Sequence, residues 1–167
     1  YNISPDESPF LSSCKKTTAK STLHEWSTDT LRSSASNAHI EGDDSVATAI
    51  TGVTRLNNRT QIFKDAIAIS DTDEGLSKIA KAKEMSYQIL KAGKSMKLDI
   101  EKALFDNNAK VAGSSSAARE LAGAPTWLTS NTVKGSGGAD ANGTGSNART
   151  DGTQTVFTQA KFDTVMQ

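Results

Sequence analysis

The stretch DEGLSKIAKAKEMSYQILKAGKSMKLDIEKALFDNN, Asp73 to Asn108, contains no proline and has the pattern of one long helix. We expect the helix to begin at Asp71, which can cap the first free amides while Glu74 reaches back as in a capping box. Apolar residues recur at spacings of three and four, which places them on one helical face. This stripe consists of Met85, Ile89, Ala92, Met96, Ile100 and Ala103. Because a helix rises about 1.5 Å per residue, a helix over 71–108 must lie across other parts of the molecule.

The Gly93-Lys94-Ser95 sequence inside this helix looks like the end of a phosphate-binding loop. That motif requires another glycine five positions before Gly93, and the residue there is Gln88. The surrounding residues are also helix formers, whereas a phosphate-binding loop joins a strand to a helix. We therefore interpret Gly93 as a point of close packing or slight bending, at a cost of about 1 kcal/mol relative to alanine.

No other motif indicates catalysis, a cofactor or a metal. The glycines at 135 and 137 lack the third glycine of a dinucleotide-binding turn, because position 140 is Asp140. His24 and Glu25 begin a zinc-protease pattern that fails at Thr28. Two histidines and the single Cys14, all far apart, give no metal-ligand spacing. The sequence therefore predicts no catalytic, cofactor-binding or metal-binding residues.

Two clusters of charged residues could bind a cation or phosphate groups. A cation could bind the cluster Glu41, Asp43 and Asp44, but the cluster lacks the alternating ligands of a calcium loop, so a solvated turn is the better interpretation. The lysines at 91, 94 and 97 form a strip that could contact phosphates, although three exposed lysines are more often a solvated helix face.

The composition favours an extended subunit over a self-contained globule. Only 35% of residues are hydrophobic and 5% are aromatic, so one chain has little material for a core. Lys plus Arg and Asp plus Glu both total 19, which removes bulk charge as a reason to bind nucleic acid or a membrane. No apolar run is long enough to span a membrane, and the first ten residues do not form a signal peptide. Since the chain has no initiator methionine and stops within a helical pattern, we expect it to be an excerpt of a longer protein.

The segments before the long helix indicate an arm and a hairpin. Residues 1–19 read as an extended arm with one apolar anchor, Phe10-Leu11. A strand is expected over 20–28, followed by a small and polar excursion with a turn at Gly42. We place another turn at Asn57-Asn58 and further strand-forming residues up to Ser70, so that 20–70 makes a long β-hairpin.

After the long helix, the sequence predicts a short helix, a long loop and a last helix. The sequence SSSAARELAGAP predicts a helix that is capped by Ser115 or Ser116 and ends with Gly123 in the left-handed conformation. The pair Trp127-Leu128 should dock this helix. Residues 130–155 are almost entirely small and polar, so we expect a mobile loop. A last helix, capped by Thr158, should place three apolar residues on one face: Phe162, Val165 and Met166.

Several strings, in order along the chain, resemble the major capsid proteins of tailed bacteriophages. They are ISPDESPFLSS (3–13), TLHEWSTDTL (22–31), EGDD (41–44), TQIFKDAIAIS (60–70), KVAGSSSAARELAGAPTWL (110–128) and GSGGADANGTGSNARTDGTQ (135–154). The resemblance implies an α+β fold of the Hong Kong 97-like capsid type, present here incompletely. It divides the chain into an N-terminal arm (1–19), an E-loop β-hairpin (20–70), a peripheral domain (71–130) with its spine helix (71–108), a flexible Gly-rich loop (131–155), and a helix leading toward the axial domain (156–167).

The resemblance also implies a function. It is that of a structural, non-enzymatic major capsid protein, which forms hexamers and pentamers in an icosahedral virion shell around double-stranded DNA. Its partners would be further copies of itself, scaffold, portal or decoration proteins, and DNA bound without sequence specificity, with assembly in the host cytoplasm and no membrane. The exposed face of the long helix would be a further packing surface. The predicted intersubunit contacts are Phe10, Leu11, His39, Ile40, Glu41, Asp43 and Asp44.

Two other functions remain open from the residues alone. A filament or tube subunit would use a long capped helix and a flexible loop equally well. A nucleic-acid-binding module would use the lysine strip, and its binding would weaken steeply with salt.

Overall fold

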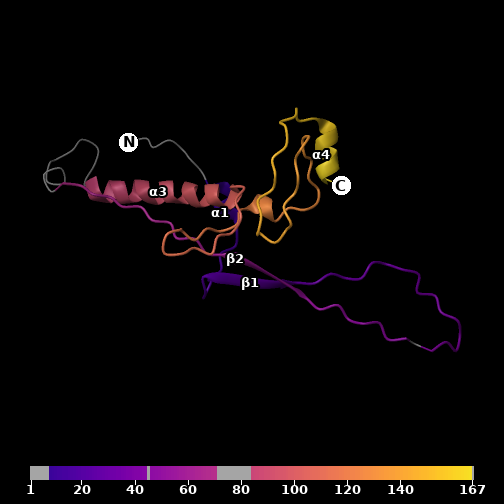
Figure 1. Cartoon of the computed structure of the whole chain (residues 1–167). Coiled ribbons are helices and arrows are strands. Elements are labelled where there is room, and N and C mark those ends of the chain that lie inside the picture. The colour runs from indigo at the N-terminus through magenta and orange to yellow at the C-terminus, as the bar shows by residue number, and fades with distance from the viewer. Residues whose placement is uncertain (1–7, 45, 71–83, 167) are drawn as a thin grey trace.

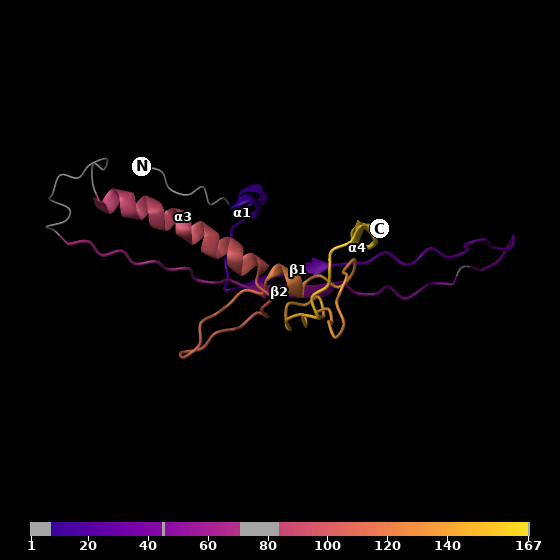
Figure 2. The ribbon, with the colours of Figure 1, turned by 90° about the horizontal axis from the view of Figure 1, so that it is seen from above.

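The structure is a computed structural model that describes residues 8–44, 46–70 and 84–166. It contains an antiparallel hairpin of β1 (Leu23–Thr28) and β2 (Thr54–Arg59), with Leu23 opposite Arg59 and Thr28 opposite Thr54. A loop of residues 29–53 joins the two strands. Figures 1 and 2 show this loop and the long helix α3 (Glu84–Phe105) extending from the hairpin in opposite directions. The described chain is therefore α+β and elongated.

The β1–β2 pairing confirms the predicted strand within 20–28 but not the predicted turn at Asn57-Asn58. Both asparagines lie within β2. Asn58 uses its side-chain amide on another segment: its Nδ2 donates to the carbonyl of Ala122 at 3.2 Å, and its Oδ1 accepts from the Ala122 N–H at 2.9 Å. The strand continues because these bonds satisfy the asparagine that would otherwise favour a turn.

The hairpin is also shorter than the predicted span of 20–70. Strand pairing ends at Arg59, and residues 61–70 run extended beside α3 (Figure 1). Phe63, Ile67 and Ile69 are half-buried, and no backbone–backbone hydrogen bond involves 61–69 in the described part of the chain. The β-branched residues of this segment therefore pack on the helix and do not extend the hairpin.

The predicted long helix is confirmed over α3, whereas its expected caps, Asp71 and Glu74, lie outside the described residues. Its end comes at Phe105, before the expected Asn108. In the stripe, Ala92, Met96, Ile100 and Ala103 are half-buried, while Met85 and Ile89 are exposed. The prediction of close packing at Gly93 is wrong for the described residues, because none of their atoms would lie within 4 Å of a Cβ at this position.

The described part of the arm contains a short helix where an extended segment was expected. Residues Pro9–Ser13 form α1, with proline in the first turn, where its missing N–H costs nothing. Figure 1 places α1 against the C-terminal half of α3.

The short helix predicted around residues 115–123 is wrong. Val111 and Glu120 form an isolated antiparallel bridge, and the Ser114 hydroxyl accepts the N–H groups of Ser116 and Ala117. A single 3-10 turn, η1 (Ala124–Thr126), follows, and Gly123 has φ −76° rather than a left-handed conformation.

Residues 131–155 form a compact loop, and its mobility stays a prediction. Ala139 and Thr150 make a β-bridge, and Ala141 is among the buried side chains. The last helix is confirmed as α4 (Gln159–Met166), which begins as the N–H groups of Lys161 and Phe162 bond to the Thr158 carbonyl. Its apolar residues remain partly exposed: Phe162, Val165 and Met166.

Candidate functional site

The junction beneath the hairpin is built around Lys110. Its ammonium donates to the Asn57 carbonyl (2.8 Å), the Asn57 Oδ1 (2.7 Å) and the Thr144 carbonyl (2.9 Å). Burial, followed by the nearby charge of Arg59, lowers the pKa of Lys110. One side chain thus joins strand β2 to the Gly-rich loop.

Two tryptophans close the same junction. The ring of Trp127, the residue expected to dock, lies 5.2 Å from that of Trp26 on β1 and 6.0 Å from the Lys110 Nζ. Leu128, its predicted companion, is exposed. Gly145, at φ +68°, lies so close to the Trp127 ring that a Cβ would be 2.6 Å from Cζ2. The hairpin is therefore fixed to the rest of the chain by contacts that leave no room for a side chain at 145.

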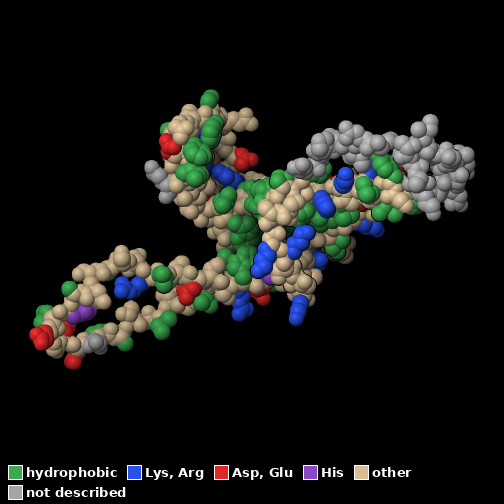
Figure 3. Space-filling view, turned by 180° about the vertical axis from the view of Figure 1, so that it is seen from behind, with side chains coloured by type: hydrophobic (Ala, Val, Ile, Leu, Met, Phe, Trp, Pro, Cys, Tyr) green, Lys and Arg blue, Asp and Glu red, His purple; other side chains and the backbone are tan. Residues whose placement is uncertain are grey.

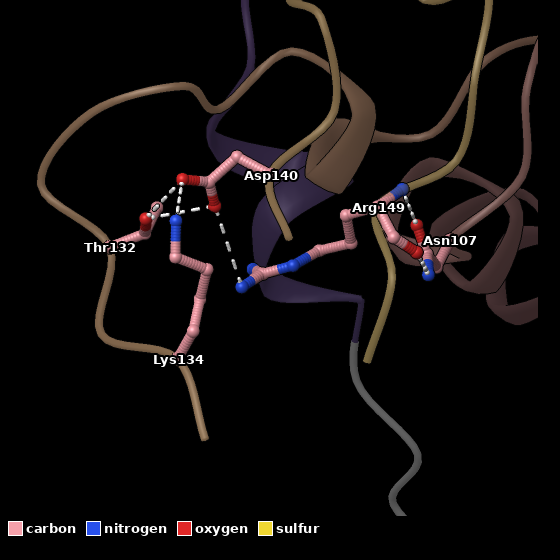
Figure 4. A network of polar contacts seen from close by, with 5 residues as sticks. All are labelled: Asn107, Thr132, Lys134, Asp140 and Arg149. Carbon is pink, nitrogen blue, oxygen red and sulfur yellow. Dashed lines mark hydrogen bonds and ion pairs between the residues drawn. The ribbon is translucent and has the colours of Figure 1, made fainter. Parts of the chain in front are cut away.

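A second polar group folds the Gly-rich loop (Figure 4). Asp140 accepts hydrogen bonds from Lys134 and from the Thr132 hydroxyl at 2.9 and 3.0 Å, and Arg149 lies 3.9 Å away. The Lys134 hydrogen bond lowers the pKa of Asp140; Thr132 and the two cationic charges act in the same direction, and desolvation opposes them. Asn107, just after α3, holds Arg149 through two hydrogen bonds with its backbone, of 2.7 and 2.9 Å.

The predicted contact residues of the arm lie against α3 of the same chain. The Phe10 ring meets Phe105 edge-on at a centroid distance of 4.7 Å. The N–H groups of Phe10 and Leu11 each donate to the Glu101 carboxylate at 3.3 Å. The negative charge therefore sits where the first turn of α1 exposes free amides.

The other five predicted contact residues gather at the far end of the 29–53 loop. Asp43 donates its N–H to the Ile40 carbonyl at 3.2 Å, with Gly42 at φ +85° between them. His39 lies 3.7 Å from the Asp43 carboxylate. Every described residue of this loop is exposed, and the structure does not bring this turn near the arm.

The 29–53 loop also carries large aliphatic side chains in solvent. Leu31 is 100% exposed and Ile50 is 98% exposed. The rest of the chain leaves most of the surface of these side chains uncovered. The exposed aliphatic residues of this loop are Leu31, Ile40, Val46, Ile50 and Val53.

The described residues contain no group of three or more histidine, cysteine, aspartate or glutamate side chains that could hold a metal ion. Among the described helices, none is long and apolar enough to cross a membrane.

Pattern reasoning missed the residues that hold the molecule together. Lys110, Asn58, Glu101 and Gly145 bind or pack against segments far away in sequence, so no local period marks them. The sequence gives only a weak signal for two of them. Asn58 is an asparagine within a run of strand-forming residues, and Gly145 is one of many glycines in its segment.

Comparisons with known proteins agree on one family. The model of the family described as "SU10 major capsid protein" matches residues 1–167. The major capsid protein of Escherichia phage Phieco32 is 33% identical over 109 residues, which cover 65% of this chain and 31% of that protein. The chain thus aligns with about a third of the length of this relative.

Proposed function

Since the chain belongs to the SU10 major capsid protein family, we propose that it is the structural head protein whose copies self-assemble into the icosahedral shell around phage double-stranded DNA. Its place is then the virion capsid, and its role is mechanical rather than enzymatic. Assembly takes place in the cytoplasm of the host.

The exposed loop of residues 29–53 carries this proposal. Five large aliphatic side chains along this loop are exposed to solvent, although the chain has few apolar residues. A subunit that lays this loop on a neighbour buries that surface in the assembly. The predicted intersubunit contacts at its end keep that role: His39, Ile40, Glu41, Asp43 and Asp44.

The order of elements supports the Hong Kong 97-like fold as part of the proposal. An arm with α1, a projecting hairpin and the long helix α3 follow one another as the N-terminal arm, E-loop and spine helix of that fold do. In this assignment α4 leads toward the axial domain, and residues 131–155 connect it to the peripheral domain.

The partners follow from the same assignment. Copies of the chain associate into hexamers and pentamers, and scaffold, portal or decoration proteins bind the shell. DNA is enclosed without sequence specificity. Phe10 and Leu11, which contact α3 of their own chain, serve as intersubunit contacts where the arm also reaches a neighbour.

Electron microscopy of the purified protein under varied salt and concentration tests the proposal. Closed shells of uniform diameter are the expected result. Open helical tubes or filaments would contradict the shell and favour the alternative function, a tube or filament subunit. Monomers under every condition would contradict both.

A further inference from the structure

The position of helix α4 depends on the Gly-rich loop. The helix packs on no other helix or strand that the structure describes, and its side-chain hydrogen bonds there stay within residues 155–164. Figure 3 shows this C-terminal part of the chain projecting from the body, with hydrophobic side chains on its surface. What fixes α4 relative to α3 is therefore the way in which the loop is folded. We divide the loop into a first leg (131–141) and a second leg (149–155), with the tip between them.

The second leg, which leads into α4, is positioned by the first. The N–H of Thr150 donates to the Ala139 carbonyl at 2.9 Å, and the N–H of Thr153 donates to the Ser136 carbonyl at 3.0 Å. Both acceptors lie in the first leg. The two backbones approach so closely that a Cβ at Gly135 would overlap the Thr153 carbonyl, which a glycine avoids. If the first leg moves, the second leg loses the acceptors that hold it.

The first leg is held in turn by Asp140. Its carboxylate accepts hydrogen bonds from the Lys134 ammonium and, at 2.9 and 3.0 Å, from the Thr132 hydroxyl. These bonds close the backbone over 132–140, which contains both acceptor carbonyls. Val133 is the one large apolar residue of the loop, and it is exposed. Polar bonds to one carboxylate, and not apolar burial, therefore fix this leg.

The start of the second leg and the tip are fixed independently of these bonds. Asn107, just after α3, accepts the Arg149 N–H at 2.9 Å and donates to the Arg149 carbonyl at 2.7 Å. At the tip, the Gly145 carbonyl accepts the Lys110 N–H at 2.9 Å. The Arg149 guanidinium adds one link across the legs, 3.9 Å from Asp140 (Figure 4). Arg149 therefore lies at the boundary between a docked part of the loop and a part that depends on the first leg.

We infer that Asp140 is a latch for α4. While its bonds are closed, α4 has a fixed position relative to α3. When they open, residues 150–166 turn about Arg149 as one segment, and the tip and the hairpin junction stay docked. Segments held by few apolar contacts are those that open locally without global unfolding. The latch thus decides where the chain presents the exposed apolar side chains next to and on α4, which are Val156, Phe157, Phe162, Val165 and Met166.

Distances between spin labels test the latch in the purified, unassembled chain, so the result does not depend on the proposed shell. The background variant is Cys14→Ser, because the exposed Cys14 would also take a label. Labels are attached through Lys97→Cys on α3 and Ala160→Cys on α4, both at exposed positions. Pulsed electron paramagnetic resonance gives the distribution of distances between them. We expect a narrow distribution in the background and a clearly broader or displaced one after Asp140→Ala.

Amide hydrogen exchange shows which part of the loop opens. The amides of Thr150 and Thr153 should exchange about tenfold faster or more after Asp140→Ala, because the loss of hydrogen bonds to a charged group frees the leg that carries their acceptors. The amides of Lys110 and Arg149 bond to residues outside the first leg and should keep their exchange rates. This difference distinguishes a latch from a general loss of stability.

The matched control is Asp151→Ala, which removes the same charge from the same loop. Asp151 is exposed, and in the described part of the chain its side chain has no hydrogen-bond or ion-pair partner. This variant should keep the distance distribution and the exchange rates of the background. Tryptophan fluorescence should be unchanged in both variants, because the Trp26–Trp127 contact lies outside the latch.

Several results would overturn the latch. One is a background distribution that is already as broad as that of Asp140→Ala, because α4 would then not be held. Another is a distribution that Asp140→Ala leaves unchanged, or that Asp151→Ala changes equally. The latch is also overturned if the Lys110 amide exchanges faster together with that of Thr150, or if the tryptophan spectrum changes, since the loop and the junction would then open as one unit.

Discussion

Gly145 gives the sharpest test of how the hairpin is fixed to the body. Its φ of +68° is unfavourable for an alanine, and the new Cβ would lie 2.6 Å from Cζ2 and 2.9 Å from Cη2 of Trp127. The Ala122 Cβ, at 3.0 Å, closes the other side. Gly145→Ala therefore forces Trp127 to move, which disturbs its contact with Trp26 at 5.2 Å.

The magnitude can be divided into two parts. A left-handed backbone costs an alanine about 1 to 2 kcal/mol, partly offset by about 0.4 to 1 kcal/mol from a less flexible unfolded chain. Overpacking adds about 1 to 3 kcal/mol. Gly137→Ala is the matched control, because Gly137 has a similar φ of +78° and no atom within 4 Å of a new Cβ. We expect Gly145→Ala to lower the free energy of unfolding by about 1 to 3 kcal/mol more than Gly137→Ala does.

Denaturant unfolding followed by tryptophan fluorescence is the assay. The chain has two tryptophans, and both lie in this junction, so the signal reports the contact directly. The native spectrum should change for Gly145→Ala and stay unchanged for Gly137→Ala. Equal losses of stability, with equal native spectra, would refute the steric argument.

Three further predictions concern other residues. Lys110→Met should lower the free energy of unfolding by about 1 to 3 kcal/mol, because three oxygen acceptors lose their donor; Lys102→Met, which removes an exposed pair, should cost less than about 1 kcal/mol in the same denaturant assay. Asp140 has a lowered pKa, so its contribution to stability is complete above the ordinary carboxyl pKa of about 3.9 and is lost as pH falls through the lower folded value. The unfolding midpoint, measured from about pH 5 down to about pH 2, should therefore fall less steeply for Asp140→Asn than for wild type, and equal slopes would contradict the assignment. Gly93→Ala should stabilise the protein by about 1 kcal/mol in thermal unfolding, since α3 has open space at this position; a loss of stability would mean that Gly93 is needed for bending or packing.

The elements that the sequence predicted well are those that local periodicity determines. The apolar spacing of three and four gave α3, and the alternation of residues over 20–28 gave β1. Both patterns need only neighbours within a turn or two of the same segment. The candidate site was predictable only in part. The residues at the loop tip can be recognised in the sequence as an acidic turn, but the sequence around them does not show which residues they contact.

Two of the failures share a physical cause, which is hydrogen bonding to residues far away in the sequence. Residues 115–123 have helix-like composition, yet Arg119 donates to the Thr60 carbonyl at 2.6 Å and Leu121 donates its N–H to the Gln61 side chain at 3.2 Å. A helix would have used that N–H within the segment. Asn58 lies in β2 and not in the expected turn for the same reason, because its side-chain amide is hydrogen-bonded to the backbone of Ala122.

The same kind of hydrogen bond explains how a chain with so few core residues holds its shape, and which part of the chain it does not hold. Polar side chains of Lys110, Asn58 and Asn107 join segments that a larger protein would join by apolar burial. These bonds concentrate around the β1–β2 hairpin, the end of α3 and the Gly-rich loop. None of comparable range reaches the described part of the 29–53 loop, whose aliphatic side chains stay in solvent. The free energy that would order this loop must therefore come from surface buried on another molecule, and a neighbouring copy of the same chain supplies it in the proposed shell.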